Sequence, residues 1–399
     1  MGSGPVTGDA DVVIVGAGAA GLSLAHRLPD TASVVLVDAP AGPLRPAERT
    51  WCFWEEERGE YDDAVAASWD RLRVRGTDGR AVEGRPGPLR YKMLRSTAFE
   101  ALVTGWLGRR PGFGRVEAAV HSVRDAPGGG GAVVRGVAGD GRRIELRARW
   151  AFDSRPPRRL PPARTTLFQH FRGWFVRTER AAFDPDIADL MDFRTRQPGR
   201  GLSFGYVLPF GPCEALVEYT EFAPALLDHD GYERALRHFT RDVLGLRGPR
   251  VTAVEQGVIP MTDAVFPRRA GKSVFRIGTA GGATRPATGY TFAAVQRQTR
   301  TIAAAYRRGR PPVPPPAHPA KSRAMDAVLL RALATGRIDG AEFFTGLFRG
   351  VPTERLLRFL DGRSTLREDL AIGLRTPVRP MLRTVAELPV LSRKTGGGR

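Results

Sequence analysis

The sequence predicts an α/β protein built from a discontinuous cofactor-binding domain, a β-rich domain inserted into it, and a helical C-terminal region. Three observations indicate this class. A strand–glycine–helix pattern opens the chain, a second one follows residue 270, and alternating apolar segments fill much of the interval. The expected bounds are 10–165 with 255–310 for the cofactor domain, 166–254 for the β-rich substrate domain, 311–324 for a Pro-rich linker, and 325–390 for the helical region.

The first pattern predicts a Rossmann-like dinucleotide-binding unit. Four apolar β-formers at 12–15 predict a buried strand, and glycines then recur at the spacing that lets backbone amides approach a pyrophosphate at a helix N-terminus. A second apolar run ends in Asp38, twenty residues after Gly18, and its carboxylate can accept hydrogen bonds from ribose hydroxyls. The alternative is a purely structural glycine turn. The expected cofactor contacts are Gly16, Ala17, Gly18, Ala20, Gly21 and Asp38.

The chain then alternates between loops, short strands and one helix up to residue 165. An aromatic-rich stretch at 49–55 is too irregular to assign, and Ser96 is the expected N-cap of the helix. Arg95, just before that helix, and Asp153, at the end of the last strand, are further candidate cofactor residues. The expected strands are 71–75, 89–93, 116–123, 132–137 and 143–150, and the expected helix is 96–107.

The inserted domain contains the candidate acid. In the strand expected at 214–220, alternation places Glu218 on one face with Leu216 and Thr220. A carboxyl group among apolar neighbours is pushed toward its neutral form, which can donate a proton. The alternative is a glutamate that faces solvent. The other elements expected in this domain are strands at 167–176, 190–194 and 202–208 and a helix at 231–244.

The second glycine pattern lies between a strand at 274–278 and a helix at 290–306. Two glycine-rich helix N-termini far apart in sequence suit a ligand with two ends, such as FAD, better than NAD. A glycine-rich turn without a ligand is the alternative. The candidate contacts are Gly278, Gly281, Gly282, Pro286, Thr288 and Gly289.

The last part of the chain begins with a proline-rich stretch at 311–319, expected to be a stiff linker. It continues as a helical, amphipathic region from 325 to 388 with a Thr365-x-x-Glu368 capping box. An apolar cluster in it has two interpretations. It either lies in the headgroup region of a membrane as an entrance lid or packs on the core. The cluster comprises Phe343, Phe344, Leu347, Phe348 and Val351.

The composition of the chain limits the kinds of partner that it is expected to bind. The net charge of +19 comes mostly from arginines scattered along the chain, without a zinc-finger or RNP-type signature, so the sequence favours an anionic membrane surface over nucleic acid. Two cysteines indicate no disulfide framework, and the histidines show no metal-ligand spacing. No apolar run reaches the eighteen residues of a membrane span. We therefore expect a cytoplasmic protein, soluble or peripheral on the membrane, with no metal and no protein partner indicated.

Several segments, in order over most of residues 10–300, resemble the bacterial lycopene cyclases, which are flavoproteins related to the aromatic-hydroxylase type of FAD monooxygenase. The region beyond residue 311 matches less clearly. Two departures stand out: Thr279 replaces the aspartate that follows the glycine in related monooxygenases, and Tyr219 replaces a second glutamate found in some cyclases. The matching segments are the N-terminal fingerprint, 50–55, 152–155, 169–174, 191–192, 204–209, 216–220 and 286–290.

The resemblance implies a redox-neutral cyclisation of lycopene or a related acyclic carotenoid, with reduced FAD as the active form and NAD(P)H as its reductant. It points to Glu218 as the acid. It leaves open whether one or both ends are cyclised and which ring isomer forms. An FAD monooxygenase or polyprenyl reductase, and a non-catalytic flavin-binding membrane protein, remain alternatives. Aromatic residues that either line the substrate pocket or belong to the core are Trp174, Phe204, Tyr206 and Phe222.

Overall fold

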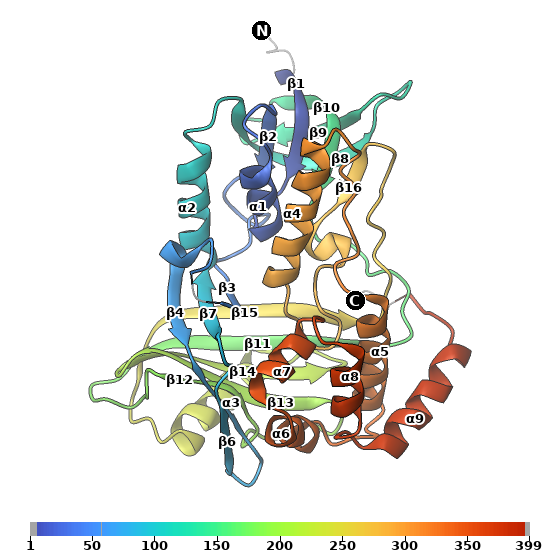
Figure 1. Cartoon of the computed structure of the whole chain (residues 1–399). Helices are drawn as coiled ribbons and strands as arrows, with labels where there is room; N and C mark the ends of the chain where they lie inside the picture. The colour runs from blue at the N-terminus through green and yellow to red at the C-terminus, as the bar shows by residue number, and fades with distance from the viewer. Residues whose placement is uncertain (1–5, 57, 396–399) are drawn as a thin grey trace.

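The computed structural model describes residues 6–56 and 58–395 and confirms the predicted α/β class. Two large sheets lie one above the other in Figure 1, and the C-terminal helices gather beside the lower sheet. A small three-stranded sheet lies between them on the left of the view. This arrangement places the interface between the two large sheets near the middle of the molecule.

The upper sheet is a parallel sheet with a meander attached to it. Its parallel strands run in the order β8-β2-β1-β10-β16, and β9 pairs antiparallel with β8 and β10 where these two extend further. Helices pack on one face and the meander on the other, so the central strands are apolar and buried. The elements are β1 (Val6–Val15), α1 (Ala19–Arg27), β2 (Val34–Asp38), α2 (Ser96–Leu107), β8 (Phe113–Asp125), β9 (Ala132–Ala138), β10 (Arg143–Asp153), β16 (Val274–Arg276) and α4 (Phe292–Arg307).

The lower sheet has the order β15-β11-β14-β13-β12-β5-β6, antiparallel except for the β12–β5 pair. One face packs against the C-terminal helices and the other against α3. The elements are β5 (Arg71–Arg75), β6 (Ala81–Gly84), β11 (Thr166–Arg177), β12 (Ile187–Asp192), β13 (Leu202–Gly211), β14 (Glu214–Ala223), α3 (His229–Arg237), a π-helical turn (His238–Val243) and β15 (Arg250–Thr262).

This sheet is larger than the inserted segment expected from the sequence. Residues 71–84, expected within the cofactor domain, form two of its strands, and the expected boundary at 254/255 falls inside β15. The reason is physical: β15 pairs with β11 along its whole length, so the strand cannot be divided between two domains.

The small sheet is formed by β3 (Thr50–Glu56), β4 (Val65–Trp69) and β7 (Leu89–Arg95) in the order β3-β7-β4, with a short helical turn, η1 (Asp62–Ala64), before β4. The aromatic-rich stretch that the sequence left unassigned is therefore a strand. Helix α2 begins at Ser96, but the prediction of Ser96 as N-cap is wrong. Arg95 occupies that position, and Ser96 Oγ instead accepts a hydrogen bond from the Arg49 amide (2.9 Å).

The C-terminal region is helical, as expected, and consists of α5 (Ala320–Ala334), α6 (Gly340–Gly350), α7 (Thr353–Leu360), α8 (Leu366–Gly373), α9 (Val378–Glu387) and a short turn, η4 (Leu388–Val390). The predicted capping box at the start of α8 is present. The proline-rich stretch packs against the upper domain, where the Pro314 and Pro315 carbonyls accept hydrogen bonds, and α5 begins inside the range expected as linker.

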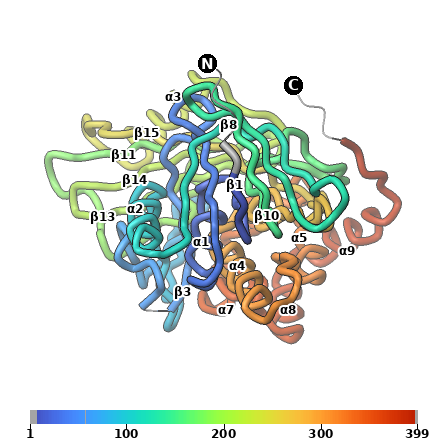
Figure 2. The backbone as a smooth tube through the Cα atoms, turned by 90° about the horizontal axis from the view of Figure 1, so that it is seen from above, coloured from blue at the N-terminus to red at the C-terminus, as the bar shows by residue number. Residues whose placement is uncertain are grey.

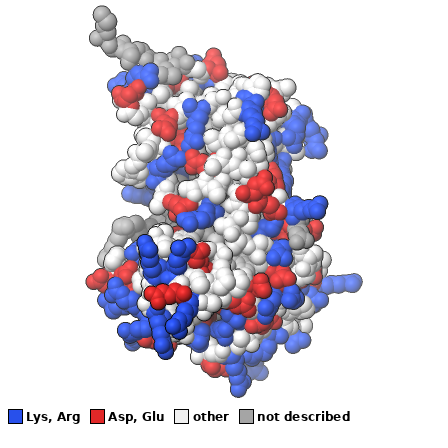
Figure 3. Space-filling view, turned by 90° about the vertical axis from the view of Figure 1, so that its left-hand side faces the viewer, with Lys and Arg blue, Asp and Glu red and all other residues white. Residues whose placement is uncertain are grey.

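The apolar cluster at 343–351 is buried, with exposed fractions between 2% and 8%. It packs into the core shared with the lower sheet, so its interpretation as a membrane-facing lid is wrong. On the face shown in Figure 3, basic and acidic side chains are interspersed. None of the helices within residues 6–56 and 58–395 is long and apolar enough to cross a membrane.

Candidate functional site

Two glycine-rich turns, far apart in the sequence, meet beside the upper sheet. In the first, between β1 and α1, a Cβ on Gly21 would lie 1.8 Å from the Gly16 carbonyl oxygen, so only glycine permits this approach. The second includes the short turn η3 (Gly278–Gly281) after β16. Gly278 has a φ of +62°, and a Cβ there would lie 2.8 Å from the Ala20 Cβ. The two predicted turns are therefore in contact.

The first turn has the geometry of a phosphate site. A Cβ on Gly18 would meet no atom within 4 Å, so the N-terminus of α1 faces open space. Asp38, at the end of β2, accepts a hydrogen bond from the Ala17 amide (3.2 Å) and pairs with Arg115 (3.0 Å). The structure thus places Asp38 beside the turn, although Arg115 shares its carboxylate.

Asp153 and Arg95 are engaged by other protein groups. The Asp153 carboxylate accepts hydrogen bonds from the backbone and the guanidinium of Arg155 (3.0 and 2.8 Å). The Arg95 guanidinium pairs with Glu48 and lies 4.4 Å from the centroid of the Phe175 ring. Neither side chain is part of the cavity wall described next.

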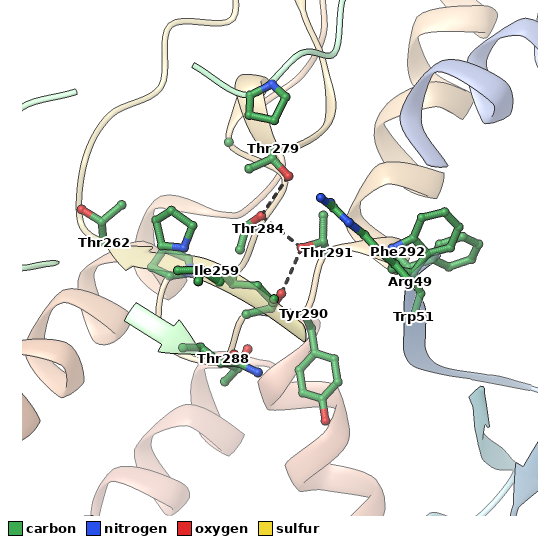
Figure 4. A pocket seen from close by; sticks show the side chains of 18 of the residues that line it. Arg49, Trp51, Ile259, Thr262, Thr279, Thr284, Thr288, Tyr290, Thr291 and Phe292 are labelled. Carbon is green, nitrogen blue, oxygen red and sulfur yellow. Dashed lines mark hydrogen bonds between the residues drawn. The ribbon is translucent and has the colours of Figure 1, made fainter. Parts of the chain in front are cut away.

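A cavity of about 670 Å³ lies where the second glycine turn faces the lower sheet (Figure 4). This volume is in the range of ligand sites. Along one wall, the Thr284 hydroxyl is hydrogen-bonded to those of Thr279 (3.4 Å) and Thr291 (3.0 Å). Five of the predicted cofactor residues line this cavity: Gly281, Gly282, Pro286, Thr288 and Gly289.

Glu218 lies in the wall of the same cavity, on β14, and is 9% exposed. Burial, and to a lesser degree the negative charge of Glu255, raise the pKa of Glu218 to about 8, against an opposing hydrogen bond from Thr220. The Thr220 hydroxyl donates to Glu218 Oε1 (2.7 Å), as their shared strand face requires. At neutral pH the carboxyl is therefore mostly protonated, and Oε2 is the atom left to hold the proton.

A row of residues crosses four strands at this point. Glu218 pairs with Tyr206 on β13 and with Gly173 on β11, and Gly173 in turn pairs with Glu255 on β15. A Cβ on Gly173 would lie 2.8 Å from Leu216 Cδ1 and 3.4 Å from Glu218 Cβ. The glycine therefore leaves room for the Glu218 side chain, with no side chain between the two carboxyl groups.

Glu255 is also buried and lines the cavity. Its carboxylate accepts hydrogen bonds from the amide and the hydroxyl of Thr50 (2.7 and 2.5 Å). Burial raises the pKa of Glu255, while the Thr50 hydrogen bonds and the positive charge of Arg95 oppose this. The Thr50 contacts fix Glu255 at the rim formed by β3.

Three tyrosines and Cys52 lie beside Glu218. Tyr91 and Tyr290 are within hydrogen-bond distance through their hydroxyls (3.3 Å), and Tyr206 faces the same cavity. Burial raises the pKa of Tyr290 to about 12 and also raises the pKa values of Tyr91, Tyr206 and Cys52 well above their ordinary values. All four groups therefore stay neutral, so the walls around Glu218 contain neutral rings rather than phenolates.

Of the four aromatic residues assigned to the pocket from the sequence, only Tyr206 lines the cavity. Trp174 pairs with Val217, on the opposite face of the sheet from Glu218, and packs under α3. Phe204 and Phe222 share the face of Glu218 but are buried deeper, in the core against the C-terminal helices. For these three, the structure supports the core interpretation.

The sequence did not single out the site residues Cys52, Tyr91 and Tyr290, and it did not place Glu255 beside Glu218. Tyr290 ends the second glycine segment, which was a usable signal. Cys52 and Tyr91 lie on strands of the small sheet, one of which was not assigned. Their approach to Glu218 depends on tertiary packing, for which one sequence gives no local signal.

The residues present fit a dinucleotide with a ring system at one end. The two glycine turns form a continuous cradle. Three polar atoms of residues that line the cavity are buried without a hydrogen-bond partner: Gln169 Oε1, Thr288 Oγ1 and His318 Nδ1. Such orphaned atoms are expected where a polar ligand binds. No cluster of metal-ligating side chains occurs among the described residues.

A family model described as lycopene cyclase protein matches residues 11–386, which includes most of the C-terminal helices. A search of curated proteins finds no match. A solved structure of a geranylgeranyl bacteriochlorophyll reductase-like protein from Thermoplasma acidophilum has a TM-score of 0.62 at 12% identity, covering 97% of this chain and 100% of that one.

Two further solved structures share the fold. A flavoprotein/dehydrogenase from Cytophaga hutchinsonii has a TM-score of 0.64 at 12% identity, covering 96% of this chain and 100% of that one. Aklavinone-11 hydroxylase, whose structure contains FAD and aklavinone, has a TM-score of 0.56 at 16% identity, covering 94% and 70%. At these identities the likeness shows the fold alone, which is the aromatic-hydroxylase type.

Proposed function

The chain belongs to the lycopene cyclase family, and on that premise we propose that it is a lycopene β-cyclase. It closes the acyclic ends of lycopene, or of a related acyclic carotenoid, to β-rings in a redox-neutral reaction that a proton starts. The observation that supports this most directly is a protonated, buried Glu218 in the wall of a cavity shared with the second glycine turn.

Glu218 is the proposed acid because an alkene is a very weak base and needs a positioned donor. The hydrogen bond from Thr220 holds Oε1, so Oε2 presents the proton. The proton adds to the terminal double bond, the resulting cation closes a six-membered ring, and a ring proton returns to the Glu218 carboxylate as the new double bond forms. Atoms and charge balance without any net oxidation or reduction.

The neutral aromatic walls perform two tasks in this proposal. The rings of Tyr91, Tyr206 and Tyr290 face a developing positive charge with their electron-rich π-systems, at about 0.5–2 kcal/mol for each well-placed ring. The same walls exclude water, which would otherwise quench the cation.

FAD is the proposed cofactor, held by the two glycine turns, with Asp38 at its ribose end and Gly281, Gly282 and Gly289 near its ring. When bound in reduced form, it supplies an electron-rich ring that stabilises the cation, and NAD(P)H serves only to keep it reduced. We also propose that the enzyme works in the cytoplasm at a membrane surface, because its substrate dissolves in lipid.

Anaerobic incubation of the purified protein with lycopene and reduced FAD in D₂O tests the reaction. We expect one deuterium in each ring formed and no change in the redox state of the flavin. Glu218→Gln should bind FAD and lose at least about a hundredfold in turnover, the usual contribution of a general acid. Conversion that requires oxygen would instead indicate a monooxygenase. Conversion that consumes one NADPH per product would indicate a reductase. If Glu218→Gln turned over lycopene as fast as wild type, the assignment of Glu218 as the acid would be refuted.

A further inference from the structure

Helices α8 and α9 expose most of their apolar side chains, whereas an ordinary surface helix turns them toward the core. On α9 the residue fully buried is Thr384, whose hydroxyl accepts a hydrogen bond from Arg337 (3.1 Å). The outward apolar residues repeat every three to five positions. We call them the C-terminal stripe: Leu366 (74% exposed), Leu370 (67%), Leu374 (68%), Val378 (42%), Leu382 (62%), Val385 (50%) and Val390 (82%).

We propose that the C-terminal stripe is the surface by which this protein docks on a bilayer that contains anionic lipids. The proposal rests on the proposed function, since it names the membrane contact of a carotenoid enzyme. Figures 1 and 2 show α8 and α9 at the outside of the molecule, with α9 projecting at its edge. Apolar side chains gathered in this way on a surface are typical of a membrane or protein contact.

The charges around the stripe favour an anionic partner. Four exposed arginines lie within it and form no ion pair with any carboxylate of the described residues: Arg367, Arg375, Arg379 and Arg383. The acidic residues of the same segment are already neutralised from within the protein, Glu368 by Arg358, Asp369 by Lys321 and Glu387 by Arg331. Two copies meeting through this face would bring unpaired arginines together, so self-association is disfavoured, whereas phosphate headgroups would pair with them.

The stripe leads to the rim of the cavity. After η4 the chain returns to pair with Ala163: the Lys394 amide donates to the Ala163 carbonyl oxygen (2.8 Å), and the Ala163 amide donates to the Lys394 carbonyl oxygen (2.9 Å). Arg393 donates to the Asp263 carbonyl oxygen (2.9 Å). Leu160 and the exposed Val265, close in sequence to these contacts, line the cavity. A membrane under the stripe would therefore lie next to the opening through which a hydrocarbon enters.

The test uses the full-length, FAD-loaded protein and vesicles of phosphatidylcholine with and without phosphatidylglycerol. We expect wild type to float with the vesicles that contain phosphatidylglycerol and to be released by salt. In Leu370→Asp/Leu382→Asp the partition coefficient should fall by tenfold or more, because two exposed apolar groups become charged. Arg379→Glu should weaken binding by about fivefold or more, and only to the anionic vesicles. The matched control is Leu226→Asp, which alters a 51% exposed leucine outside the stripe.

Each outcome decides the proposal. Flotation of the double variant like wild type, absence of flotation of wild type, or a lipid-free dimer that the double variant abolishes would overturn it. Turnover separates the docking surface from the proposed reaction. The double variant should cyclise lycopene at the wild-type rate in detergent micelles and more slowly from vesicles. A wild type that floats but converts lycopene in neither medium would refute the reaction and leave the docking surface intact.

Discussion

Replacing Glu218 by Gln tests the electrostatics of the site separately from its chemistry. The substitution keeps the size of the side chain and its hydrogen bond with Thr220, and it removes the ionisable group. In the folded protein, burial raises the pKa of Glu218 to about 8, whereas its ordinary value is 4.5. Between these two pH values the folded protein holds a proton that the unfolded chain has lost, so this residue lowers the free energy of unfolding as pH rises.

The size of the effect follows from the shift. Each pH unit between 4.5 and 8 lowers the contribution of Glu218 to the free energy of unfolding by about 1.4 kcal/mol. Over the whole interval the loss of stability is on the order of 5 kcal/mol, and it is complete at alkaline pH. Glu218→Gln does not carry this penalty. Relative to wild type, the variant should therefore gain stability steadily between pH 5 and pH 8, and the gain should level off above pH 8.

The assay is urea unfolding of both proteins, without added FAD, at several values between pH 5 and pH 9.5. Titrating groups that do not interact with Glu218 cancel in the difference between the two free energies of unfolding. Glu368→Gln serves as control: hydrogen bonds with the Thr365 amide and Arg358 hold the pKa of Glu368 at about 2, so its difference from wild type should be constant over this range. A flat difference for Glu218→Gln as well would mean that Glu218 is ionised in the folded protein, and the acid mechanism would fail.

Three further substitutions test other parts of the structure. Asp326→Asn breaks a buried ion pair with Arg285 (2.7 Å) and should lower the free energy of unfolding by about 3–5 kcal/mol, as measured by denaturation at pH 8; an unchanged stability would show that the pair is solvated. Gly21→Ala would place a Cβ 1.8 Å from the Gly16 carbonyl oxygen and should abolish FAD binding, as followed by flavin absorbance after gel filtration. Trp174→Leu, on the sheet face away from the cavity, should cost about 2–3 kcal/mol of stability and leave the kcat for lycopene unchanged; a large fall in kcat with normal folding would return Trp174 to the site.

Local patterns predicted the parts of the site that depend on local geometry. Glycine spacing identified both turns, because the close approaches at Gly21 and Gly278 exclude any side chain. Strand alternation placed Glu218 on the same face as Thr220, which the hydrogen bond between them confirms. The resemblance to the lycopene cyclases is confirmed by a family match over residues 11–386.

Features that depend on long-range packing were missed or misplaced. Nothing local indicates that Glu255 would lie across Gly173 from Glu218, since their strands become neighbours only through β11. The C-terminal helices show the same limit of local sequence patterns. Periodicity revealed apolar faces on its helices, but it could not say that the phenylalanines near 343 point inward while Leu370 and Leu382 point outward.

The contact between Ala20 and Gly278 has a consequence for biosynthesis. More than 250 residues separate the two halves of the cradle, so a ribosome adding about 5–20 residues per second needs roughly 13–50 s to deliver the second after the first. Throughout that delay the nascent polypeptide contains the first glycine turn but lacks the second, which is the proposed binding site of the flavin ring. FAD can therefore stabilise the chain only after synthesis of both turns. We expect the cellular supply of flavin to determine how much of the newly made protein stays folded, and not how fast folding begins.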